Sequence, residues 1–304
     1  MAGFALNLYA IGIVIAVVIV WFIAHRRRTA RLPEHIVPVV AASRRRALMA
    51  IVCALSVFFA LVVAGLTLPG LLGSPFAFAS TLAGAAGLLL YALTPPRVAE
   101  VPAGAPRSAG LERRSWLSVI PKGWLHGFAE VGAVFVIVIV FCGLTADADD
   151  HGRSRGIGFG DEDVSSLATP YPGWFYGVPA LVGLSVLAAA VVLALHRIGS
   201  APAFPAPEDA NADMQWRQAS ASVILKLAMG AMLFTLGGIM LMAGSVMSSA
   251  VIEDVTSVVW SVISDAMLIM GIVALVVSIV SVTLAALTAF TIGERLTRVP
   301  EPVR

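Results

Sequence analysis

Three ionisable residues lie inside strongly apolar stretches of this 304-residue chain and are the first candidates for chemistry. Glu130 and Lys226 each stand about seven residues into an apolar segment, and His126 precedes Glu130 by one helical turn. At ~1.5 Å per helical residue, Glu130 and Lys226 would share a depth of ~10 Å from one end of a helix bundle. Ionisable side chains in membrane segments are costly and often functional. The sequence therefore predicts an intramembrane polar cluster of His126, Glu130 and Lys226, able to relay protons or bind a substrate group.

The same three residues are also compatible with less specific roles. Lys226 has a stem long enough to carry its ammonium group to the membrane interface. His126 lies close enough to the end of its segment to sit among lipid headgroups. Glu130 is the hardest to explain in this way, because its side chain is short. Both interpretations stay open at the level of sequence.

The elements that position these residues follow from composition. Hydrophobic residues make up 59% of the chain and charged residues only 12%, whereas a soluble domain has about 25% charged residues. We therefore predict an all-α, polytopic transmembrane helical bundle that forms a single membrane domain. Because about 20 apolar residues cross the hydrocarbon core, seven spans are expected, at about 4–24, 47–67, 76–94, 124–144, 173–195, 219–243 and 265–290.

The distribution of basic residues predicts the orientation of these spans. The first apolar segment has its basic residues after it, not before it, so we interpret it as an uncleaved span whose N-terminus is outside. With seven spans the C-terminus is then cytoplasmic, as are the loops 95–123 and 196–218. Eighteen of the twenty Lys and Arg residues fall in or beside the cytoplasmic segments, and the other two, Arg153 and Arg155, lie in the acidic extracytoplasmic loop 145–172. This asymmetry agrees with the positive-inside rule.

The acidic loop has part of a calcium-site pattern. Asp147, Asp149, His151 and Gly152 fit the first positions of a calcium-binding loop loosely, but Gly158 stands where a bidentate Glu is needed. Loose cation binding by the carboxylates remains an alternative. No dedicated metal site is predicted.

The loop also contains a glycine pattern that phosphate-binding loops use. Gly156, Gly158 and Gly160 form G-x-G-x-G, but the spacing and the flanking transmembrane segments differ from a nucleotide-binding fingerprint. We therefore expect a solvated, flexible turn and no cofactor.

Aromatic residues gather where the chain returns to the membrane after this loop. Tyr171, Trp174 and Tyr176 are expected to form an interfacial aromatic belt, with a substrate-binding patch as the alternative. Further along, valines recur at helical spacing within 246–264. That segment is predicted to be an interfacial helix or an outward extension of the last span.

A seam of small residues marks the sixth predicted span. Gly230, Gly237 and Gly244 recur every seven residues, and such seams let a second helix approach closely. The neighbouring helix belongs either to this chain or to a homo-oligomer or membrane partner subunit.

Functional motifs are scarce. The sequence contains no H-E-x-x-H, P-loop, G-x-S-x-G or C-x-x-C, so an enzyme is disfavoured although not excluded. The basic residues follow the inner membrane face, where anionic lipid and not nucleic acid is the expected partner. We expect a multi-pass protein of a bacterial plasma membrane. The favoured function is a non-catalytic accessory, scaffold or assembly subunit. The alternative is a small transporter or permease that uses the cluster around Glu130 and Lys226.

Overall fold

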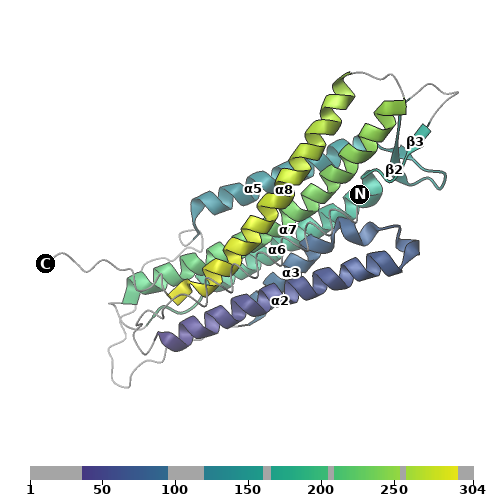
Figure 1. The fold of residues 1–304 in the computed structure, drawn as a ribbon. Helices are drawn as coiled ribbons and strands as arrows, with labels where there is room; N and C mark the ends of the chain where they lie inside the picture. Colours follow the sequence, from purple (N-terminus) through teal and green to yellow (C-terminus); the bar gives the residue numbers. More distant parts are fainter. Residues whose placement is uncertain (1–35, 95–119, 160–165, 205–208, 254–257, 294–304) are drawn as a thin grey trace, which may run out of the picture.

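The computed structural model describes residues 36–94, 120–159, 166–204, 209–253 and 258–293. In the labelling of Figure 1, its helices are α2 (Val37–Thr67), α3 (Ala79–Leu93), α5 (Lys122–Leu144), α6 (Trp174–Gly199), α7 (Ala210–Glu253) and α8 (Val258–Phe290). Two short 3-10 helices, η1 (Pro69–Leu71) and η2 (Ser74–Ala77), join α2 to α3. Three short strands follow α5, namely β1 (Asp147–Ala148), β2 (Ser154–Phe159) and β3 (Ser166–Ala168).

Five of these helices are long and apolar enough to cross a membrane: α2, α5, α6, α7 and α8. The helix α3 is also apolar but has only 15 residues, and together with η2 it covers most of the predicted span 76–94. The first predicted span, 4–24, lies outside the described residues. The structure thus agrees with a mostly helical, multi-pass membrane protein, while the count of seven spans stays a prediction.

Several helices are longer than the predicted spans. The helix α7 has 44 residues, or about 66 Å, against ~30 Å of hydrocarbon. It continues to Glu253, and α8 already begins at Val258. Of the predicted segment 246–264, residues 246–253 continue α7 and residues 258–264 begin α8, while 254–257 lie outside the described residues. Asp265 lies inside α8 with an exposed side chain and does not begin the helix.

Basic side chains and strands mark opposite ends of the bundle. At one end α2 begins while α6 and α8 finish, and Arg44, Arg197 and Arg217 lie there. We call it the arginine end. At the other end lie η1, η2 and the three strands, together with the end of α7 and the beginning of α8 (Figure 1). We call it the sheet end.

The helix α7 is the centre of the bundle. In its most apolar window 83% of the residues are buried, against 28–39% in the other four long helices. It forms a long antiparallel pair with α8 and also contacts α2, α3, α5 and α6. The surrounding helices consequently bury one side and expose the other.

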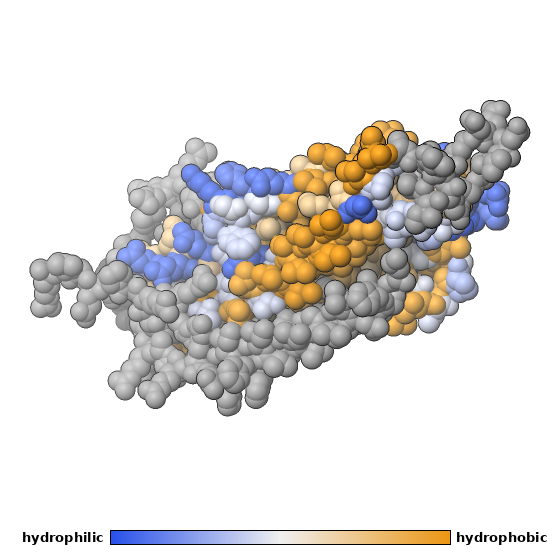
Figure 2. Space-filling view, turned by 45° about the horizontal axis from the view of Figure 1, so that its top comes forward, coloured by the Kyte–Doolittle hydropathy of each residue, from blue (hydrophilic) through white to orange (hydrophobic). Residues whose placement is uncertain are grey.

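The exposed sides of the outer helices are apolar. Examples are Val52 on α2, Ile137 on α5, Val182 on α6 and Ile272 on α8, each more than half exposed. Figure 2 shows this as an orange surface between ends that carry blue, hydrophilic residues. A soluble protein rarely exposes apolar area on this scale, so these sides are suited to lipid.

The acidic loop is more ordered than the sequence indicated. β1, β2 and β3 form an antiparallel sheet in that order, and β2 and β3 contact α7. Carboxylates hold the turns: Asp149 accepts hydrogen bonds from the backbone N–H groups of His151 and Arg153, and Asp147 accepts one from Gly158. The expectation of a flexible turn is wrong for these described residues, because the acidic side chains replace missing backbone partners.

Candidate functional site

Lys226 is the buried cation of the predicted polar cluster. Its side chain is only 6% exposed, and it comes from the middle of α7. Its ammonium Nζ donates a 2.8 Å hydrogen bond to Thr288 Oγ1 of α8 and lies 4.9 Å from the centre of the Trp124 ring of α5. A buried ammonium needs such partners, because desolvation without them costs several kcal/mol. Three helices therefore meet at Lys226.

Glu130 and His126 do not line this site. The structure exposes both side chains on the outer side of α5, while Trp124 of the same helix faces Lys226. Six residues separate Trp124 from Glu130, which turns Glu130 about 120° away and raises it ~9 Å along the helix. The sequence therefore placed Lys226 too far from the beginning of α5, because depth was counted from approximate span ends. It also took no account of which side of the helix each residue occupies.

The exposed side of α5 has a consistent composition. His126 and Glu130 are followed along the same side by Val134, Ile137 and Leu144, all exposed. Two alanines, Ala129 and Ala133, are exposed beside them. We call these seven residues the α5 outer face. It combines one carboxylate and one imidazole with apolar and small residues.

The arginine end holds polar contacts that the sequence did not reveal. Trp216 Nε1 donates a 2.7 Å hydrogen bond to Ser43 Oγ, which joins α7 to α2. Arg46 Nη2 donates to the carbonyl of Tyr91, and its guanidinium stacks 4.4 Å from the Tyr91 ring, which joins α2 to α3. The only sequence signals were the Arg run 44–46 and the neighbouring Trp and Arg on α7.

Arg217 is a buried side chain of this end with several hydrogen bonds. It is 2% exposed and donates two hydrogen bonds to the Asp213 carboxylate. It also donates to the carbonyls of Ile198, Gly199, Ala201 and Pro202. The last carbonyls of α6 have no partner within the helix, so Arg217 satisfies them and fixes the end of α6 against α7. This role is structural.

The glycine seam packs within the chain. A Cβ atom on Gly237 would lie 2.8 Å from the carbonyl oxygen of Gly271, and one on Gly244 would lie 2.8 Å from that of Ser264. Gly230 likewise faces Val282, and Ser278 Oγ donates to the Gly230 carbonyl. All three glycines therefore face α8, and the seam supports ordinary packing between α7 and α8.

Of the three aromatic residues predicted to form an interfacial belt, Tyr171 and Tyr176 are buried and Trp174 is half-buried. Tyr171 is fully buried, and its hydroxyl bonds with Thr145 Oγ1 at 2.7 Å. Tyr176 donates to the carbonyl of Leu72, 104 residues away. Trp174 is half-buried against Gly143. Buried tyrosines usually find a hydroxyl partner, and here one partner lies 26 residues earlier at the end of α5 and the other lies between α2 and α3.

The acidic loop carries no metal site in the part that the structure describes. No group of three or more His, Cys, Asp or Glu side chains converges among these residues. The Arg153 amide and the Arg155 side chain, with the His151 amide, lower the pKa of Asp149 to about 2. The Asp149 carboxylate therefore accepts its hydrogen bonds from residues of the same loop.

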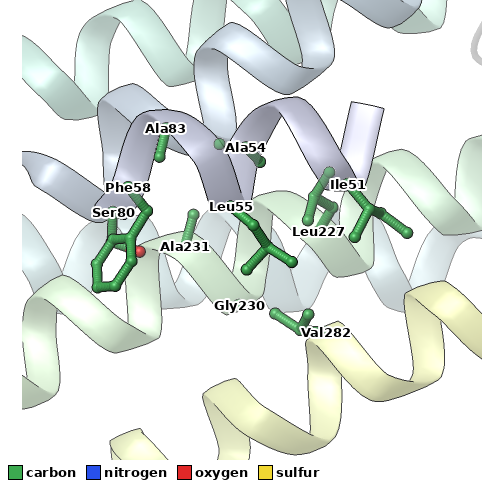
Figure 3. A pocket seen from close by; sticks show the side chains of 11 residues that line it. Ile51, Ala54, Leu55, Phe58, Ser80, Ala83, Leu227, Gly230, Ala231 and Val282 are labelled. Atoms are coloured by element: carbon green, nitrogen blue, oxygen red, sulfur yellow. The ribbon is translucent and has the colours of Figure 1, made fainter. Parts of the chain in front are cut away.

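An apolar cleft lies between α2, α3, α7 and α8 (Figure 3). It encloses about 40 Å³. Its walls are Ile51, Leu55 and Phe58 on α2 and Val282 on α8. Small residues form its floor, namely Ala83, Gly84, Gly230 and Ala231. Because Ile51, Leu55 and Val282 are only half-buried, the cleft is open on the side where lipid would lie.

Comparison of the chain with protein-family models, with curated proteins and with solved structures finds no match.

Proposed function

We propose that this chain is a non-catalytic accessory or assembly subunit of a bacterial plasma membrane, and that it binds a membrane partner through the α5 outer face. The observation that carries the proposal is Glu130, an exposed carboxylate on a membrane helix. It lies about 12 Å along α5 from Lys122, well within the hydrocarbon depth. A carboxylate facing lipid at that depth is costly.

A partner helix would remove this cost. A Lys, Arg or hydroxyl side chain on the partner would pair with Glu130, and Ala129 and Ala133 beside it allow the close approach that membrane helices prefer. The apolar residues Val134 and Ile137 extend the contact. The face therefore has the composition of a helix interface with one specificity-determining charge.

Site-specific photo-crosslinking tests the proposal in intact membranes. A photoreactive residue at Ile137, which is 66% exposed on α5, is compared with one at Val192, which is 53% exposed on α6. We expect a discrete protein adduct from position 137 and only lipid adducts from position 192.

Charge variants then test the role of Glu130. Glu130→Gln should lower the yield of the position-137 adduct several-fold, while the control Asp265→Asn, another exposed carboxylate of a long helix, should leave it unchanged. An unaltered adduct in Glu130→Gln, or lipid adducts alone from position 137, would refute the proposal. Thermal unfolding of each variant in detergent separates lost binding from lost folding.

A small transporter is the second candidate, and Lys226 is the observation that favours it. A buried ammonium held by Thr288 and Trp124 has the chemistry to bind an anion in transit. Transport would make ion or solute flux into proteoliposomes dependent on Lys226, so Lys226→Met should abolish flux while Glu130→Gln should not. An accessory subunit predicts no flux from the purified wild-type protein.

A further inference from the structure

We infer that the cleft between α2 and α8 is a binding site for one anionic phospholipid, whose headgroup binds at Arg44 and whose acyl chain enters the cleft. The proposal is independent of the α5 outer face, because α5 does not line the cleft. It rests on the position of a cation relative to an open apolar cleft.

Arg44 stands directly in line with the cleft wall. Ile51 and Leu55 follow it by seven and eleven residues on α2, which are about two and three full helical turns, so the three side chains lie on one side of the helix. The guanidinium of Arg44 lies 4.5 Å from the centre of the Phe290 ring at the end of α8. Arg44 therefore bridges the two helices that form the mouth of the cleft.

Depth also fits a lipid. The cleft begins at Ile51, about 10 Å along α2 from Arg44. One leaflet of hydrocarbon is about 15 Å deep, so a chain attached to a headgroup at Arg44 reaches the cleft and occupies its first part. The positive-inside rule assigns this end of the bundle to the inner leaflet, where anionic lipids are enriched.

Arg44 and the cleft together match the two parts of an anionic lipid, its headgroup and its acyl chain. Arg44 is exposed and has Arg45 next to it, so a phosphate can pair with it at the membrane surface. The cleft is mainly apolar, with Ser80 the one polar side chain among its lining residues, and it opens between Ile51, Leu55 and Val282. A free phosphate ion would bind at Arg44 only, whereas an uncharged lipid would occupy the cleft only.

Photolabelling of the full-length protein in nanodiscs tests the site. The probe is phosphatidylglycerol with a diazirine in one acyl chain, and the reference is phosphatidylcholine with the same chain. We expect the anionic probe to label peptides with Ile51, Leu55 or Val282 several-fold more than the zwitterionic probe. Equal labelling by the two probes would overturn the proposal. Absence of label from these peptides would overturn it too, and is expected if the 4–24 segment or a second copy fills the cleft.

Two pairs of variants separate the headgroup from the chain. Arg44→Gln should reduce labelling by the anionic probe to the zwitterionic level, while Arg197→Gln, an exposed arginine at the end of α6, should not. Leu55→Trp should fill the cleft and reduce labelling by both probes there. Val52→Trp is its control, because Val52 is 61% exposed on another side of α2. Equal effects within either pair would refute the site, and circular dichroism confirms that each variant is folded.

Discussion

The glycine seam between α7 and α8 allows a sharp test, because two neighbouring glycines differ completely in their surroundings. A Cβ atom on Gly237 would lie 2.8 Å from the Gly271 carbonyl oxygen and 3.0 Å from Leu275, whereas one on Gly238 would have nothing within 4 Å. We therefore predict that Gly237→Ala destabilises the protein relative to Gly238→Ala.

The expected difference can be worked from these contacts. Both substitutions place alanine in a helix interior, which stabilises a helix by about 1 kcal/mol over glycine. That gain is common to both variants and cancels when they are compared. The remaining difference is the overpacking of Gly237 against the α8 backbone, which typically costs about 1–3 kcal/mol. Backbone cannot move aside as a flexible side chain can, so we expect the upper half of this range.

Unfolding of the full-length protein in mixed micelles measures this difference. The fraction of sodium dodecyl sulfate is raised stepwise, and helix content is followed by circular dichroism. Gly238→Ala should unfold at the same fraction as wild type or a higher one, and Gly237→Ala at a lower one. If the two variants unfold within about 0.5 kcal/mol of each other, the close approach of α7 and α8 is not as described, and the seam would be free to face a partner.

Two further predictions concern the ends of the bundle. Arg217→Ala removes the buried ion-pair partner of Asp213 and should lower the free energy of unfolding by about 3–5 kcal/mol; in the same micelle assay, the double variant with Asp213→Ala should lose less than the sum of the two single losses. At the sheet end, the pKa of Asp149 is lowered to about 2, so its contribution is complete above the ordinary carboxyl pKa of about 4 and disappears as pH falls from about 4 to 2. Hydrogen exchange of the His151 amide, corrected for intrinsic rates, should lose protection over this pH range; Asp149→Ala, which removes the acceptor, should remove the protection already at pH 7, and the exposed Asp150→Ala should not. Protection that is unchanged by Asp149→Ala would contradict this account.

The apolar runs predicted the main elements well, since nothing but a helix satisfies its own backbone in lipid. The centres of α2, α5, α6, α7 and α8 coincide with predicted spans. The ends of α2, α5 and α8 also coincide with predicted ends, whereas α2, α7 and α8 begin earlier than predicted, with extra turns that tertiary contacts such as Trp216 with Ser43 stabilise. Hydropathy carries no information about such pairs, which lie 173 residues apart.

The candidate site was less predictable for a related reason. A depth counted along a span says nothing of the direction in which a side chain faces, and Trp124, not Glu130, turned out to face Lys226. Tyr171 and Tyr176 resembled interfacial residues because their partners, Thr145 and Leu72, lie 26 and 104 residues away in the sequence. The seam was the better case: glycine spacing predicted close helix approach, and the structure identified α8 as the neighbour.

The sheltered position of α7 affects how the protein meets membranes of different thickness. Lipid touches mainly the surrounding helices, so hydrophobic mismatch acts on their tilt and hardly on α7. The central helix, at about twice the hydrocarbon thickness, would keep its length in a thin or a thick bilayer while the outer helices lean around it. The helix α7 would then hold the arginine end and the sheet end at a constant separation in any membrane.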